Sequence, residues 1–268
     1  MTSAVMPVEF YEELEPLLPE ETPVAPQGGR PRVSHSVVMR VIWFVLVSGC
    51  RWEDVPQETG CSGRTAHRRL EEWERLGIWD RLHMRLLARL KKAHKLNLNV
   101  AIVDGVTVRA FGGGEDTGPS PVDRRKKGTK HTVMVDAHGI PLAIRTAPAN
   151  ASDHRQIIPV ILDFPHVGGT PGRPQELPKD VYADRGYDSD PTRGLLSWLG
   201  IRPHIARRRT AHGSGLGVIR WVVERTIGWI KGLRRMRIRY DRLGIIQGAW
   251  NTLAAAVICF RIACEQCL

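Results

Sequence analysis

Apolar residues recur along the chain with two different spacings, and the change between them divides the sequence in two. Before residue 96 the spacing is helical, and it predicts one helix over residues 37–47 and a second over residues 64–76. From residue 98 the apolar residues form short runs instead, beginning with Leu98–Val103, and such runs are typical of strands. The sequence therefore predicts a helical N-terminal part followed by a part that contains a sheet.

The second part alternates strands with helices. After the first strand, the expected elements are strands at 131–135 and 141–147, a helix at 152–162, a strand at 181–183, a helix at 190–199, a strand at 201–206 and helical structure from about residue 217. Elements in this order predict an α/β fold with a mixed sheet flanked by helices.

Three segments follow from these textures. Residues 1–30 are interpreted as a flexible lead-in, residues 31–95 as a small all-α domain and residues 96–268 as the α/β domain. In the all-α domain, basic residues lie opposite the apolar face of the second helix, and two helices around a small turn are the layout of a helix-turn-helix. An ordinary three-helix bundle with a solvated basic face has the same pattern, so both interpretations stay open at this point.

The charge balance points to a polyanionic partner. The 268 residues include 39 Lys and Arg against 28 Asp and Glu, which gives a formal net charge of +11. Nucleic acid is the first candidate for the partner and an anionic membrane the rival. The most apolar stretches, 41–47 and 253–260, are too short to span a bilayer, and the first 21 residues are acidic and proline-rich, unlike a signal peptide. Five cysteines without a disulfide framework suit a reducing cytosol.

Two predicted strands run directly into an aspartate. Asp104 follows Leu98–Val103, and Asp184 follows Val181–Ala183. If these strands are neighbours, the two carboxylates meet at one edge of the sheet, where oxygen ligands favour Mg²⁺ or Mn²⁺. Either aspartate alone is equally well explained as the cap of a turn.

A third acid lies on the helix predicted from residue 217. Glu224 shares one helical face with Arg220 and Lys231, since the three follow the i, i+4, i+11 spacing. A structural alternative exists here also, because Glu224 and Arg220 have the spacing of an ordinary i, i+4 salt bridge. Trp221 and Trp229 on the same helix are interpreted as buried.

Several stretches in order along the chain resemble one family. They are GCRWEDVP, RLEEWERLGIWDRL, VDGVTVRA, GEDTGPSPVDRRKKGTKHTVMVDAHGIPLA, ANASD, YADRGYDS and RWVVERTIGWIKGLRRMRIRYDR. Together they resemble the DDE transposases of the IS5/IS4 insertion-sequence group. The C-terminal signature of that group, Tyr-x2-Arg-x3-Glu-x6-Lys, matches at Arg220, Glu224 and Lys231, whereas Gly217 stands at the tyrosine position.

The resemblance implies a fold, a site and a reaction. The fold would be RNase H-like, with residues 31–95 as a DNA-binding helix-turn-helix. Asp104, Asp184 and Glu224 would be the catalytic residues and would hold two Mg²⁺ or Mn²⁺ ions. The enzyme would bind the terminal inverted repeats of its element, hydrolyse the DNA strand at the ends and join the 3′-OH to target DNA.

Double-stranded DNA is therefore the expected partner, engaged by two copies of the chain in a bacterial, cytoplasmic, nucleoid-associated setting, with no membrane involved. The expected DNA contacts are Arg220, Lys231, Arg64, Thr65, Arg68, Lys126, Lys127 and Lys130. The alternative is a transposase-derived regulator that binds DNA without cutting it.

Overall fold

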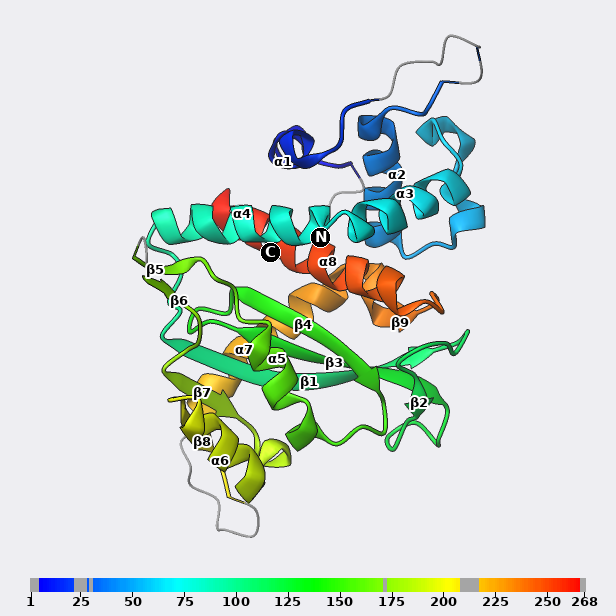
Figure 1. Ribbon diagram of the computed structural model, residues 1–268. Coiled ribbons are helices and arrows are strands. Elements are labelled where there is room, and N and C mark those ends of the chain that lie inside the picture. Colours follow the sequence, from blue (N-terminus) through cyan, green and yellow to red (C-terminus); the bar gives the residue numbers. More distant parts are fainter. Residues whose placement is uncertain (1–4, 22–27, 29–30, 171–172, 208–216, 266–268) are drawn as a thin grey trace.

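The computed structural model describes residues 5–21, 28, 31–170, 173–207 and 217–265. Four α-helices come first: α1 (Val8–Leu14), α2 (His35–Ser48), α3 (Gly63–Arg75) and α4 (Ile78–Lys92). They form the upper part of the molecule in Figure 1. The predicted helical N-terminal part is confirmed, and α2 ends where Gly49 takes a left-handed φ of 71°.

The expected flexible lead-in over residues 1–30 is wrong for its described helix. Phe10 and Leu14 of α1 are fully buried. The ring of Phe10 packs 5.1 Å from that of Trp43 and 5.2 Å from that of Phe260, measured between centroids. Burying this apolar face against two distant parts of the chain orders a segment whose own pattern is too short to predict a helix.

The small turn expected between the first two predicted helices is also wrong. Residues 49–62 join α2 to α3 and contain two short 3-10 helices, at Trp52–Asp54 and Gln57–Thr59. A helix-turn-helix uses a turn of about three or four residues. The helices themselves are confirmed, but their connection is an extended one.

The remaining part is built on a mixed seven-stranded sheet. Its strands are β1 (Val100–Ala110), β2 (Gly118–Pro119), β3 (Lys127–Val135), β4 (Pro141–Pro148), β7 (Asp180–Ala183), β8 (Arg202–Ile205) and β9 (Ile238–Arg239). The main strands lie in the order β4-β3-β1-β7-β8; β3 runs antiparallel to β1 and β4, and β7 and β8 run parallel to β1. This order, flanked by helices, is the RNase H-like arrangement expected from the resemblance. A separate hairpin consists of β5 (Gly168–Thr170) and β6 (Arg173–Gln175).

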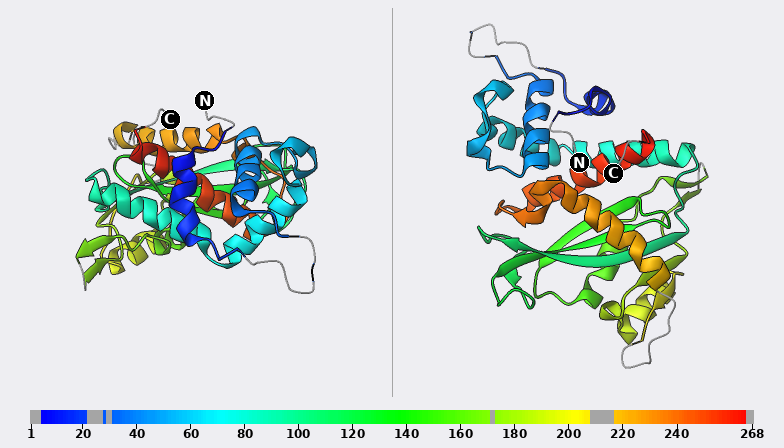
Figure 2. Two further views of the ribbon diagram at one scale, coloured as in Figure 1. Left: turned by 90° about the horizontal axis from the view of Figure 1, so that it is seen from above. Right: turned by 180° about the vertical axis from the view of Figure 1, so that it is seen from behind.

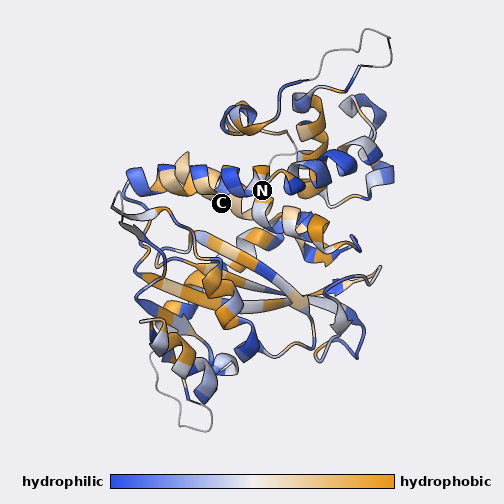
Figure 3. Cartoon of the chain, in the orientation of Figure 1, coloured by the Kyte–Doolittle hydropathy of each residue, from blue (hydrophilic) through white to orange (hydrophobic). Residues whose placement is uncertain are grey.

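Helices cover both faces of the sheet. α7 (Gly217–Gly232) lies on one face and α5 (Ile157–Leu162) on the other, as the opposite views of Figures 1 and 2 show, and α6 (Asp190–Trp198) packs beside β8. α8 (Gly244–Ala263) lies between α4 and β4 and joins the N-terminal helices to the sheet. Figure 3 shows apolar colouring on the central strands and alternating polar and apolar colouring along α4.

From the sequence, the apolar stretch at 253–260 was expected to be too short to span a bilayer, but the helix that contains it, α8, is longer than that stretch. It is the one helix among the described residues that is long and apolar enough to cross a membrane, with a mean hydropathy of 1.4. Within the structure 78% of that apolar window is buried, against α4 and β4. Its apolar character is therefore accounted for by its place in the core.

A buried arginine fastens the two parts together. The Arg235 guanidinium donates to Asp241 Oδ2 at 2.8 Å and to the Cys50 carbonyl at 3.0 Å. It also lies 5.6 Å from the ring centroids of both Trp52 and Trp250. Since Trp52 and Cys50 belong to the α2–α3 connection, this cluster fixes that connection against the C-terminal segment.

Candidate active site

Asp104 and Asp184 occupy neighbouring positions on adjacent parallel strands. Val103 of β1 is paired with Ala183 of β7, and each aspartate directly follows one residue of this pair in the chain. The prediction that both strands end here is correct for β7 and wrong for β1, which continues to Ala110 because β3 pairs with it as far as Arg109. Beyond Val103, β1 therefore has a partner on its β3 side but has lost β7 on the other.

The backbone after each aspartate holds its carboxylate in place. Asp104 Oδ1 accepts a hydrogen bond from the Gly105 N–H at 2.7 Å, and Asp184 Oδ1 accepts one from the Gly186 N–H at 2.8 Å. Asp184 thus caps the turn at Arg185–Tyr187, as a turn-forming aspartate would. Asp184 therefore both caps this turn and occupies the position next to Asp104 on the adjacent strand.

Glu224 reaches the aspartates through an arginine. Arg220 Nη2 lies 3.2 Å from Glu224 Oε1 and 3.6 Å from Asp104 Oδ2. The i, i+4 salt bridge considered from the sequence therefore exists. Because the same guanidinium also contacts Asp104, α7 is tied to β1 at this point, and the salt bridge does not exclude a role for Glu224 in the site.

The charges of the other two acids act on Asp104. Burial raises the pKa of Asp104, and the carboxylates of Asp184 and Glu224 raise it further. The Gly105 N–H and the Arg220 guanidinium act in the opposite direction. An effect of this kind on Asp104 requires that the charges of Asp184 and Glu224 lie near it.

The donor set suits a hard divalent cation, although the side chains do not converge as they stand. Among the described residues, no three His, Cys, Asp or Glu side chains lie close enough to hold one ion. Asp104, Asp184 and Glu224 offer only oxygen ligands, which Mg²⁺ and Mn²⁺ prefer. Asp104 and Asp184 fit such an ion at the sheet edge. Glu224, with its side chain 56% exposed, has room to move toward them.

Comparison with known proteins decides the family. Residues 96–259, more than half of the chain, match the family described as a transposase DDE domain. The chain is a DDE transposase. Residues 6–83 match the putative transposases of the IS4/5 family.

Two relatives of the transposase come from Burkholderia cepacia. A putative transposase for insertion sequence element IS402 is 49% identical over 144 residues, covering 54% of this chain and 68% of the relative. A 16.2 kDa protein of the same insertion element is 42% identical over 123 residues, covering 45% of this chain and 84% of that protein. The transposase therefore has the character of an insertion-sequence enzyme, and DDE transposases use divalent metal ions.

Among solved structures, the pre-cleavage Mos1 transpososome and the Mos1 strand transfer complex are similar to the chain. The match with the first covers 89% of this chain and 79% of the Mos1 chain, with 10% identity and a TM-score of 0.33. The match with the second covers 90% of this chain and 81% of the Mos1 chain, also with 10% identity and a TM-score of 0.33. A TM-score of this size is too low to transfer residue positions.

The predicted DNA contacts of the transposase differ in accessibility. Lys126 and Lys127 are exposed at the start of β3, as a phosphate contact requires. Lys231 is partly buried. Burial lowers the pKa of His131 to about 4, and the charges of Arg239 and Lys231 contribute, so Lys231 lies near strand β3.

The expectation of a solvent-facing contact is wrong for Lys130. Its side chain is only 11% exposed, and Nζ donates to Asp153 Oδ1 at 2.5 Å and to the Ala151 carbonyl at 2.6 Å. Lys130 belongs to the same basic run as Lys126 and Lys127, but the strand register turns its side chain inward. The run alone could not distinguish it from its neighbours.

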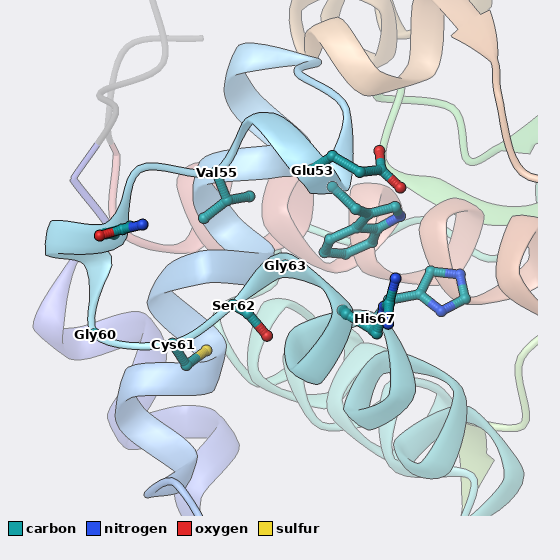
Figure 4. A pocket seen from close by; sticks show the side chains of 10 residues that line it. Glu53, Val55, Gly60, Cys61, Ser62, Gly63 and His67 are labelled. Atoms are coloured by element: carbon teal, nitrogen blue, oxygen red, sulfur yellow. The ribbon is translucent and has the colours of Figure 1, made fainter.

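The predicted contacts on α3 lie on its first turns. Arg64 and Arg68 are exposed and Thr65 is half-buried, while Ser62 caps the helix by accepting from the Thr65 N–H at 3.2 Å. Arg64 lines a pocket of about 640 Å³ between the α2–α3 connection and α3, shown in Figure 4 with Ser62, Gly63 and His67 around it. Thr65 and Arg68 line the adjacent pocket.

The interpretation of both α7 tryptophans as buried is wrong for Trp221, which is 51% exposed. The Arg225 guanidinium lies 4.7 Å from the Trp221 ring centroid and 4.6 Å from that of Trp229. The spacing of the two tryptophans is also that of residues on the buried face of a helix. Only the packing of α7 therefore shows that Trp221 is exposed.

Proposed function

We propose that the transposase binds the terminal inverted repeats of its insertion sequence, hydrolyses the DNA strand at the ends and joins the 3′-OH to target DNA. Asp104, Asp184 and Glu224 would be the catalytic residues and would hold two Mg²⁺ or Mn²⁺ ions. The observation that carries the proposal is the adjacency of Asp104 and Asp184 on paired strands, with Arg220 linking Glu224 to Asp104.

The roles of the residues follow from their chemistry. When bound, paired divalent ions supply an activated nucleophile and stabilisation of the leaving oxygen. Asp104 and Asp184, anchored by the N–H groups of Gly105 and Gly186, would keep their carboxylates in a fixed position at the sheet edge. Arg220 has the planar fork that binds a phosphate with two hydrogen bonds, and would turn from the acids to the DNA backbone.

DNA would be held by surfaces on both parts of the chain. The exposed Lys126 and Lys127 would contact phosphates beside the site, together with Lys231, and the first turns of α3 would contact the terminal repeats. The net charge of +11 supports a strongly salt-dependent interaction with DNA. Two protomers would act on the paired ends, in the bacterial cytoplasm at the nucleoid, without a membrane partner.

The test is cleavage of a DNA library that contains the element's ends, in the presence of Mn²⁺, by the wild type and by Glu224→Gln. We expect the variant to bind DNA as the wild type does and to lose cleavage about a thousandfold, because loss of a metal ligand removes several kcal/mol of transition-state stabilisation. Glu71→Gln is the matched control, since Glu71 also forms an i, i+4 pair, with Arg75 at 2.7 Å.

Equal cutting by the wild type and Glu224→Gln would remove Glu224 from the mechanism. Binding without cutting by the wild type would instead favour the alternative, a DNA-binding regulator that has lost catalysis.

A further inference from the structure

A fourth carboxylate lies on the face of the sheet opposite α7, against the backbone that follows Asp104 and Asp184. Asp153 begins the 3-10 turn between β4 and α5, and its Oδ1 accepts the hydrogen bond from Lys130. Lys130 is paired with Thr107 in the β1–β3 register, whereas Asp104 is paired with Val133. Because side chains alternate along a strand, Lys130 and Asp104 point to opposite faces.

Two glycines bring Asp153 close to the catalytic backbone. A Cβ added at Gly105 would lie 3.8 Å from Asp153 Oδ1, and one added at Gly186 would lie 3.1 Å from Asp153 Oδ2. Gly105 follows Asp104 directly, and Gly186 follows Asp184 by two residues. The Asp153 carboxylate therefore lies against the β1 backbone after Asp104 and against the turn after Asp184.

A buried hydroxyl without a hydrogen-bond partner marks the same place. Tyr187 is 1% exposed, and its Oη lies 3.0 Å from the position of a Cβ on Gly105. Burial and the charges of Asp104, Asp153 and Asp184 raise its pKa well above its usual value, so the hydroxyl keeps its proton. The hydroxyl interacts with the Thr132 side chain without a well-formed hydrogen bond, so an ion-bound water or a carboxylate would serve as its acceptor.

The two oxygens of Asp153 have different surroundings. Oδ1 is committed to the ammonium of Lys130, which is nearly buried, whereas Oδ2 lies on the Gly186 side. Mg²⁺ keeps several of its waters when it binds carboxylates, and residues that orient these waters or the ligands strongly affect its affinity.

We propose that Asp153 is a positioning residue of the metal site, which orients water on the ion held by Asp104 and Asp184 while Lys130 fixes its direction. This inference rests on the proposed function, since it assumes that Asp104 and Asp184 bind the ion.

The first experiment maps the site on the full chain with Fe²⁺, ascorbate and peroxide, in which the bound iron cuts the nearby backbone. We expect cuts near residues 104, 153 and 184, all suppressed by excess Mg²⁺. Cuts near 104 and 184 without one near 153 would overturn the role of Asp153 and leave the proposed function intact. Absence of cuts near 104 and 184 would overturn both.

The second experiment measures the Mn²⁺ dissociation constant of Asp153→Asn by the free-ion signal in electron paramagnetic resonance. We expect affinity to fall about tenfold, the lower end of the effect of losing an outer-shell partner. Asp163→Asn is the matched control, because Asp163 is similarly exposed and pairs with Arg145 at 3.2 Å. The control should bind Mn²⁺ as the wild type does.

Thermal unfolding in EDTA separates positioning from a purely structural role. An Asp153→Asn protein that loses stability in EDTA but keeps the wild-type Mn²⁺ affinity would show that the Lys130–Asp153 pair only supports the fold, and would overturn the proposal. Unchanged stability with weakened Mn²⁺ binding would support it.

Discussion

Arg220 and Arg235 lie in the same basic C-terminal segment, and each binds a carboxylate, yet their surroundings are opposite. The Arg235 and Asp241 side chains are 2% and 7% exposed, and their nitrogen and oxygen lie 2.8 Å apart. The Arg220 side chain is 39% exposed, and its guanidinium lies between Asp104 and Glu224 at longer distances of 3.6 and 3.2 Å.

The difference separates an arginine that holds the fold from one that would serve the proposed site. Arg235 is enclosed by aromatic rings and by the carbonyl of a distant segment, so its contacts exist only in the folded chain. Arg220 is partly solvated, and it is shared between two acids that also carry like charge near each other. Like charges kept close together cost folding energy, which is typical of a site arranged for a cation.

The largest effect on stability is expected from Arg235→Ala. Removing the guanidinium leaves Asp241 buried without its cation, which costs about 3–5 kcal/mol in the free energy of unfolding. Chemical denaturation measures this loss. Arg234→Ala is the control, because Arg234 is the exposed neighbour and should change stability little. A loss below about 1 kcal/mol for Arg235→Ala would break the comparison, since exposed ion pairs already reach that value.

The next effect is expected from Arg220→Ala, and it concerns activity. Stability should change by less than about 1 kcal/mol, because the pairs of Arg220 are partly exposed. Strand cleavage should fall about 10- to 100-fold, as expected for the loss of a charged hydrogen bond to phosphate. Denaturation and cleavage assays on the same preparation test both statements, and a variant that unfolds easily while cutting normally would reverse the roles assigned to the two arginines.

The smallest effect is the pH dependence of stability in Asp104→Asn. The folded-state pKa of Asp104 is raised, mainly by burial, so the folded protein binds this proton more tightly than the unfolded chain. Asp104 therefore lowers stability as the pH rises from its unfolded pKa through its folded pKa, and the cost is complete above that window. Asp104→Asn should be at least as stable as the wild type at pH 7, with the difference vanishing below the unfolded pKa. Thermal unfolding across pH would contradict this if the variant were less stable at pH 7.

Much of the site was predictable because its residues carry local signals. Asp184 follows a short apolar run and Glu224 falls on a helical face with Arg220, so the patterns made them candidates, and the resemblance to the DDE transposases selected them. Asp153 is part of the ANASD stretch, but it stands at the start of the helix predicted at 152–162, where an acid is common for local reasons. Nothing local indicated that two distant glycines would admit its carboxylate beside Asp104 and Asp184.

The sequence by itself determined the helical and strand textures and the family resemblance, which in turn predicted the three acids, because each of these depends on residue types at short spacings. Only the tertiary structure decided that β1 continues past Asp104, that Lys130 points inward while Trp221 points outward, and that Arg235 is buried while Arg220 is not. The physical reason is that burial and side-chain direction depend on strand register and on partners far away in the chain, which periodicity does not record.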